Sequence, residues 1–104
     1  MSSEQDAQVA DLIFGNPVEY HYEGRAYWKE PCKSWIVELY RFTTDARADY
    51  TVLEFVRENW EPSRQRDMAL ELLKLWNGRT NMPELCYVAG DYSRAALAVM
   101  GESE

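Results

Sequence analysis

Two amphipathic runs on either side of Pro62 constrain the fold of this chain more than any other feature. Wound at about 100° per residue, residues 50–60 place Val52, Val56 and Trp60 along one side of a helix. Charged side chains, among them Glu54 and Glu58, fall on the opposite side. As a strand, the same run would place Glu54 between Val52 and Val56 on one face. We therefore predict a helix that is buried on one side.

The run that follows Pro62 has a second apolar stripe at the same period. Its members are Met68, Ala69, Leu72, Leu73, Leu75 and Trp76. The two stripes together predict a helical hairpin, in which Leu72 is buried and Glu58 is exposed. Asn77-Gly78 ends the second helix, and a glycine at this position commonly adopts the left-handed conformation. Thr44 or Asp45 is the expected cap of the first helix, with Asp49 as an alternative start.

The segment before the hairpin has the pattern of an antiparallel sheet. Val18, Tyr20 and Tyr22 alternate with polar residues, which predicts a half-buried strand. Gly24 marks a turn, and residues 25–29 can return as the partner strand. Residues 34–43 are rich in strand formers on both faces, so we expect a strand that is central or covered on both sides.

Shorter elements are expected at the two ends of the chain. Val9, Leu12 and Ile13 fall on one side of a short N-terminal helix that stops at Gly15. Residues 93–100 contain good helix formers and predict a short C-terminal helix. Residues 85–89 are a short apolar run, either a strand or an extended segment.

These elements predict an α+β fold: a short N-terminal helix, an antiparallel sheet of about three strands, a helical hairpin packed on one face, and a short C-terminal helix. With 104 residues, the chain is expected to form one compact domain over residues 1–104, with fraying at 1–5 and 101–104. A hydrophobic fraction of 46% is sufficient for a folded core.

Charge and cysteine content narrow the class of protein. The net charge of −7 disfavours binding to duplex DNA, which requires basic side chains, and suits a basic protein partner or simple solubility. The first residues lack a basic start and an apolar core, and no run reaches the roughly 20 apolar residues of a membrane span, so we expect a cytoplasmic location. Cys32 and Cys86 are then expected as thiols, although a single disulfide between them stays open.

The sequence contains no catalytic or cofactor motif. His21 is the only histidine, and its spacing from Cys32 and Cys86 does not suit a metal site. Cys86 has no neighbouring base that would activate it as a nucleophile. Glu54 and Glu58 lie one helical turn apart, as in a metal bridge, but Arg57 lies between them and a solvated surface is the simpler interpretation. We expect no enzyme activity, no cofactor and no metal.

The leading hypothesis is therefore a small acidic protein-binding module. It would act as an adaptor or inhibitor of a larger assembly that handles nucleic acid, as compact acidic accessory proteins of phages and mobile elements do. A second hypothesis is mimicry of nucleic acid by one exposed band of carboxylates, and a third is binding of single-stranded nucleic acid by an aromatic sheet face. The candidate partner-binding residues are Tyr27, Trp28, Asp45, Asp49, Glu54, Glu58 and Glu61.

Overall fold

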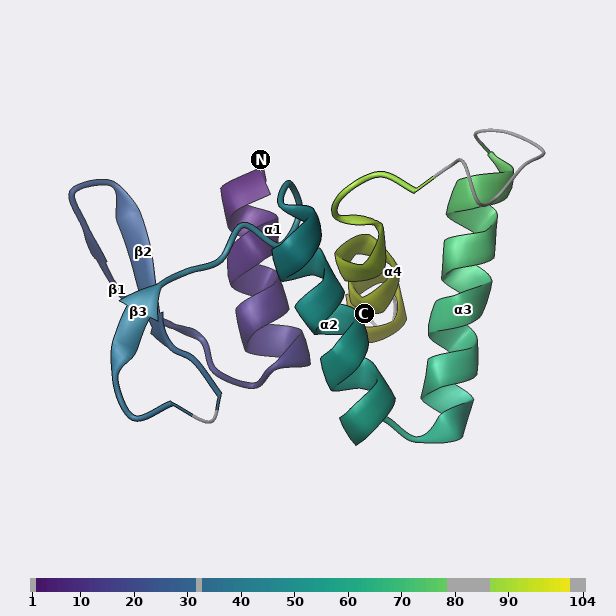
Figure 1. The fold of residues 1–104 in the computed structure, drawn as a ribbon, viewed down its shortest axis with the longest axis horizontal. Coiled ribbons are helices and arrows are strands. Elements are labelled where there is room, and N and C mark those ends of the chain that lie inside the picture. The colour runs from purple at the N-terminus through teal and green to yellow at the C-terminus, as the bar shows by residue number, and fades with distance from the viewer. Residues whose placement is uncertain (1, 32, 79–86, 102–104) are drawn as a thin grey trace.

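The computed structural model describes residues 2–31, 33–78 and 87–101. It confirms the α+β class, with a three-stranded antiparallel sheet at one end and helices over the rest of an elongated molecule of 43 × 27 × 25 Å (Figure 1). Cys32, Cys86 and residues 79–84 lie outside the described residues, as does part of the apolar run at 85–89. Residues 87–89 of that run form no strand.

The N-terminal helix has two parts. Helix α1 (Ser2–Gln8) continues into η1 (Val9–Ile13), a wider turn in which the Phe14 N–H donates to the Val9 carbonyl, five residues back. Val9 and Ile13 are buried as predicted, but Leu12 is 37% exposed. The prediction for Leu12 was wrong because the wider turn has more residues per revolution and rotates this side chain away from the core.

The sheet consists of β1 (Val18–Tyr22), β2 (Arg25–Lys29) and β3 (Ile36–Glu38), in that order, so β2 is the central strand. The prediction of a long central strand at 34–43 was wrong. β3 is a short edge strand, and after Leu39 the chain leaves the sheet so that Phe42 enters the helical core, where it is fully buried. The apolar residues of the segment 34–43 are therefore divided between the sheet and the helical core.

The face that the alternation of β1 was expected to bury is open. Tyr20 is 49% exposed and Tyr22 is 61% exposed. Tyr20 pairs with Tyr27 across the strands, and their rings stack at 5.2 Å on the outer face of the sheet. No described element covers this face. The prediction that Val18, Tyr20 and Tyr22 share one buried side was wrong, because the register shifts between Val18 and Tyr20, so that Val18 pairs with Trp28 and Tyr20 pairs with Tyr27.

The helical hairpin is confirmed as α2 (Ala46–Asn59) and α3 (Pro62–Asn77). Asp45 caps α2, because its side chain accepts a hydrogen bond of 2.9 Å from the Arg47 N–H. Gly78 closes α3 in the right-handed conformation, with φ at −74°, so the left-handed prediction was wrong. The backbone N–H of Gly78 donates to the carbonyls of Lys74 and Trp76 in the last turn of α3.

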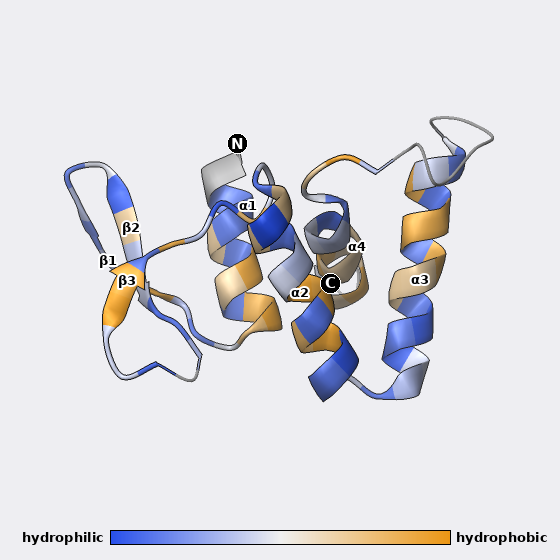
Figure 2. Cartoon of the chain, viewed as in Figure 1, coloured by the Kyte–Doolittle hydropathy of each residue, from blue (hydrophilic) through white to orange (hydrophobic). Residues whose placement is uncertain are grey.

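The C-terminal helix α4 (Asp91–Gly101) packs against α2, α3 and η1 (Figure 1). It therefore occupies the space between the two helices of the hairpin. Met68 and Leu72 of α3 are buried as predicted, but Ala69 and Leu73 face solvent. Hydrophobic and hydrophilic bands alternate along α2 and α3, as expected of helices that are buried on one side (Figure 2).

One hydrophobic core connects η1, α2, α3 and α4 with the sheet. Its buried members are Val9, Ala10, Ile13, Trp28, Phe42, Ala48, Val52, Val56, Met68, Leu72, Ala95 and Ala96. The sheet supplies a single described member of this set, Trp28, which lies on the inner face of β2. Among the described residues, no helix has the length and apolar character needed to cross a membrane.

Candidate functional site

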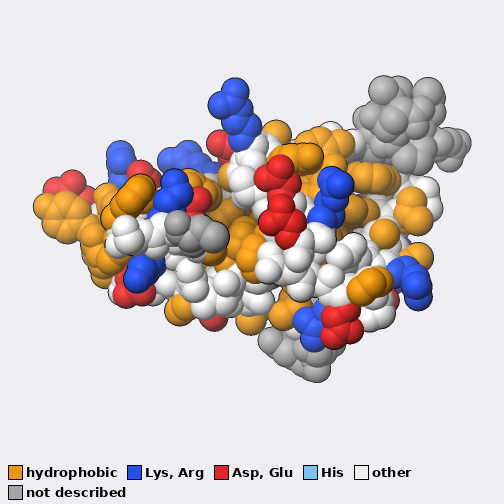
Figure 3. All heavy atoms as spheres, turned by 60° about the horizontal axis from the view of Figure 1, so that its bottom comes forward, with side chains coloured by type: hydrophobic (Ala, Val, Ile, Leu, Met, Phe, Trp, Pro, Cys, Tyr) orange, Lys and Arg blue, Asp and Glu red, His pale blue; other side chains and the backbone are white. Residues whose placement is uncertain are grey.

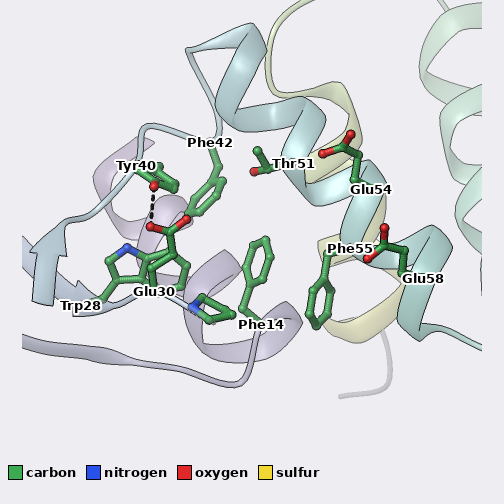
Figure 4. A pocket seen from close by; sticks show the side chains of 10 residues that line it. Phe14, Trp28, Glu30, Tyr40, Phe42, Thr51, Glu54, Phe55 and Glu58 are labelled. Carbon is green, nitrogen blue, oxygen red and sulfur yellow. Dashed lines mark hydrogen bonds between the residues drawn. The ribbon is translucent and has the colours of Figure 1, made fainter. Parts of the chain in front are cut away.

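A pocket of about 200 Å³ lies where the end of the sheet meets α2 (Figure 4). It has a hydrophobic floor and a rim of carboxylates. Its lining residues are Phe14, Trp28, Glu30, Pro31, Tyr40, Phe42, Thr51, Glu54, Phe55 and Glu58. They come from four segments that are distant in sequence, so the pocket exists only in the folded chain.

The floor is a cluster of aromatic rings. The ring centroids of Trp28, Tyr40 and Phe42 are 5.8 to 6.0 Å apart, and the rings meet edge to face at 73 to 87°. Phe14 joins them, at 5.5 Å from Phe42 and 4.6 Å from Phe55. Trp28 and Phe42 are buried, whereas the other three rings are half-buried and offer the accessible part of the floor. Such edge-to-face packing is favourable and holds the rings in fixed orientations.

Local chain geometry explains how these rings come together. Phe14 follows η1 and precedes Gly15, whose φ of +77° turns the chain toward β1. Trp28 pairs with Val18 and Val37 of the neighbouring strands, so the three side chains share the inner face of the sheet. Phe42 reaches the same place from the segment that leaves β3.

Three carboxylates form the rim, which we call the carboxylate rim: Glu30, Glu54 and Glu58. Glu54 and Glu58 lie one turn apart on α2, and Glu30 follows β2 on the other wall. Within the described part of the chain, none of the three forms an ion pair with a lysine or arginine. The rim therefore presents negative charge next to an apolar floor. Carboxylates also lie among hydrophobic and basic side chains elsewhere on the surface, as the face in Figure 3 shows.

Tyr40 holds Glu30 in place. The Tyr40 hydroxyl donates a hydrogen bond of 2.6 Å to Glu30 Oε1 (Figure 4). Burial raises the pKa of Tyr40 to about 12, and the hydrogen bond to Glu30 and its negative charge act in the same direction. The hydroxyl is therefore protonated at neutral pH and remains a donor. Glu30 Oε2 has no hydrogen bond to any described residue and is available to a ligand.

The floor also contains a buried donor without an acceptor. Trp28 is 1% exposed, and its indole N–H makes no hydrogen bond to the described residues. A buried N–H without a partner costs stability, which is why such groups are rare in folded proteins.

The structure brings three of the predicted partner-binding residues to the pocket: Glu54 and Glu58 at the rim and the buried Trp28 in the floor. Glu61 is exposed at the turn between α2 and α3, and Asp45 is exposed at the start of α2. Asp49 is fully buried and binds the start of α4. The exposed band of five carboxylates that mimicry of nucleic acid requires is therefore not formed.

Tyr27 and Trp28 lie on opposite faces of the sheet. Tyr27 is half-buried on the outer face beside Tyr20, whereas Trp28 is in the core. The expectation that Trp28 is available for stacking on a single strand was wrong, because the segment at 40–42 and Phe14 cover its ring.

Sequence patterns did not reveal the other half of the pocket: Glu30, Tyr40, Phe14 and Phe55. Glu30 and Pro31 fall between the predicted strands at 25–29 and 34–43, and Phe55 lies beside the predicted buried stripe of α2. The sequence contains one indication of a ligand site. Phe55 lies on the flank of an amphipathic helix, next to the exposed carboxylates of Glu54 and Glu58.

Comparison of the chain with protein-family models, with curated proteins and with solved structures finds no match. In the described ranges, no group of three or more His, Cys, Asp or Glu side chains is arranged to hold a metal ion.

Proposed function

We propose that this chain is a small non-enzymatic module that binds a basic protein partner through the pocket and its carboxylate rim. The observation that carries the proposal is the rim itself: Glu30, Glu54 and Glu58 surround an aromatic floor, and no described cation pairs with them. Carboxylates beside a hydrophobic floor suit a lysine or arginine side chain, which combines a charged end with an apolar stem.

The net charge of the whole chain also favours a basic partner. The net charge of −7 attracts a basic surface and accelerates its association at low salt. Aromatic side chains at the centre of a binding surface commonly contribute much of the affinity. The pocket places such rings beneath the charges that attract the partner.

A charge-reversal experiment tests this proposal. The double variant Glu54→Lys/Glu58→Lys changes the rim, and Glu19→Lys/Glu23→Lys makes the same change of charge on exposed residues of the β1–β2 hairpin. Each protein is used to capture partners from a nuclease-treated extract of its native cell. A partner that is captured by the wild type and by the hairpin variant, but not by the rim variant, supports the proposal. Equal capture by all three proteins contradicts it.

A second candidate function is binding of single-stranded nucleic acid by the outer face of the sheet. Stacked Tyr20 and Tyr27 and exposed Tyr22 lie there with Arg25 and Lys29, which are exposed. Bases stack on such rings, and cations contact the phosphates. A labelled oligonucleotide that binds the wild type at physiological salt and does not bind Tyr20→Ala/Tyr22→Ala would favour this function over the first.

A further inference from the structure

We infer that the pocket seats the guanidinium group of an arginine side chain of the partner; this inference rests on the proposed function and names the group that is recognised. The pocket volume of about 200 Å³ suits the end of one long side chain. The choice of arginine over lysine follows from the distribution of the carboxylates and from the aromatic floor.

The carboxylates of the rim lie on two walls. Glu54 and Glu58 project from α2, and Glu30 lies across the aromatic rings from them (Figure 4). A guanidinium group has five N–H donors in a planar fork and can address carboxylates on both sides at once. An ammonium group is a compact charge with three donors, so it satisfies one wall and leaves the other in water.

The floor favours the same cation. A planar guanidinium stacks on aromatic faces and is more weakly hydrated than an ammonium, so it loses less hydration energy against apolar rings. Phe14, Tyr40 and Phe55 supply the half-buried rings on which it can lie. Lysine would have to give up more of its hydration shell at the same place.

Tyr40 is a positioning residue in this arrangement. Its hydroxyl engages Glu30 Oε1 and so directs the remaining oxygen to the ligand. Without that hydrogen bond, Glu30 can turn to solvent, and the wall opposite α2 loses its fixed charge. Tyr40→Phe keeps the aromatic ring and removes only the donor.

The test uses three capped amino acids as probes: the N-acetyl methylamides of arginine, lysine and citrulline. Citrulline has the shape of arginine but no charge. Each is titrated into the ¹⁵N-labelled wild-type chain, and amide shifts are followed in NMR spectra. We expect arginine to bind with a Kd on the order of 1 mM and to shift the amides of Glu30 and Phe55. Lysine should bind at least about fivefold more weakly, and citrulline should leave the spectrum unchanged.

Variants assign the binding to the pocket. Glu30→Gln and Tyr40→Phe should each weaken arginine binding by about threefold or more while the lysine affinity changes little, because lysine depends on one wall only. Glu19→Gln, on an exposed residue outside the pocket, should bind arginine like the wild type. A merely structural effect of Tyr40→Phe would lower both affinities together.

Equal affinities for arginine and lysine would overturn the inference and leave the proposed function standing. An absence of shifts at the pocket with capped arginine would also overturn it, even if a basic partner is captured. Failure of the proposed function is distinguishable, because it appears as capture that the rim variant Glu54→Lys/Glu58→Lys does not reduce.

Discussion

Asp49 of α2 accepts two hydrogen bonds from Ser93 of α4 through the same carboxylate oxygen, one from the backbone N–H at 2.8 Å and one from the hydroxyl at 2.6 Å. Its other oxygen accepts from the Tyr92 N–H at 3.1 Å and from the Tyr87 hydroxyl at 2.7 Å. A carboxylate of one helix thus satisfies the free N–H groups at the start of another, where negative charge is favoured by the helix dipole. The hydrogen bonds between Asp49 and Ser93 therefore join α4 to the hairpin.

The first prediction concerns this carboxylate. Asp49→Ala should lower the free energy of unfolding by about 3 to 5 kcal/mol, because several buried donors lose their acceptor at once. Chemical denaturation provides the measurement. Asp67→Ala, at an exposed position of α3, is the matched control and should change the stability by no more than about 0.5 kcal/mol. Equal effects of the two changes would show that Asp49 does not hold α4 in place.

A second prediction contrasts two residues of the hairpin. Leu72 is 9% exposed in the core, so Leu72→Ala should cost about 2 to 5 kcal/mol of stability. Glu58 is exposed, so Glu58→Ala should cost no more than about 0.5 kcal/mol. The midpoints of urea unfolding measure both changes. If the order of the two effects were reversed, the register of the hairpin would be wrong.

Two glycines with positive φ provide a third prediction. A Cβ at Gly90, where φ is +99°, would lie 2.3 Å from the Thr43 carbonyl oxygen, whereas a Cβ at Gly15, where φ is +77°, would meet nothing within 4 Å. Gly15→Ala should therefore cost only the conformational strain of about 1 to 2 kcal/mol. Gly90→Ala adds a steric clash with the backbone and should cost more, as thermal unfolding of the two variants can show. Similar melting temperatures would mean that Gly90 does not approach Thr43 closely.

A fourth prediction concerns the pH dependence of stability. Burial raises the pKa of Asp6 above its ordinary value of 3.8, although Thr43 opposes this by donating from its N–H at 2.9 Å and its hydroxyl at 3.0 Å. Because the folded pKa is raised, the contribution of Asp6 to stability is fully present below the unfolded pKa and is lost as the pH rises through the folded pKa.

Asp6→Asn removes this titration and retains one oxygen to accept from Thr43. The difference in unfolding free energy between the variant and the wild type should therefore shift in favour of the variant as the pH rises from 3 to 7. Denaturation curves at several pH values measure it. A difference that is constant with pH would show that Asp6 titrates alike in the folded and unfolded chains.

The helices could be predicted from sequence because their apolar spacing repeats over several turns. Val52, Val56, Met68 and Leu72 are buried as their period predicts. Burial in the sheet was harder to predict, since an alternating pattern of apolar and polar residues identifies the two faces of a strand and does not say which face is covered. Tyr20 and Tyr22 occupy the predicted face, but no other element of the described chain lies over it.

The candidate site could be predicted only in part, for a related reason. The common placement of Glu54 and Glu58 could be predicted because both belong to one helix, and their spacing of four residues places them on one side of it. Glu30 and Tyr40 meet them only after the chain has folded back between β2 and α2, and local patterns contain no information about such distant contacts. Asp49 was misjudged as exposed because acidic residues are rarely buried unless they are paired, and its partners lie in α4.

The position of α4 between α2 and α3 has a consequence for how this chain is made. The ribosome delivers α2 and α3 before α4, so the apolar sides of both helices face water until α4 emerges and joins η1 and the hairpin. The core can therefore close only after α4 has left the ribosome, and rapid docking of α4 shortens the time during which these apolar sides are exposed to aggregation.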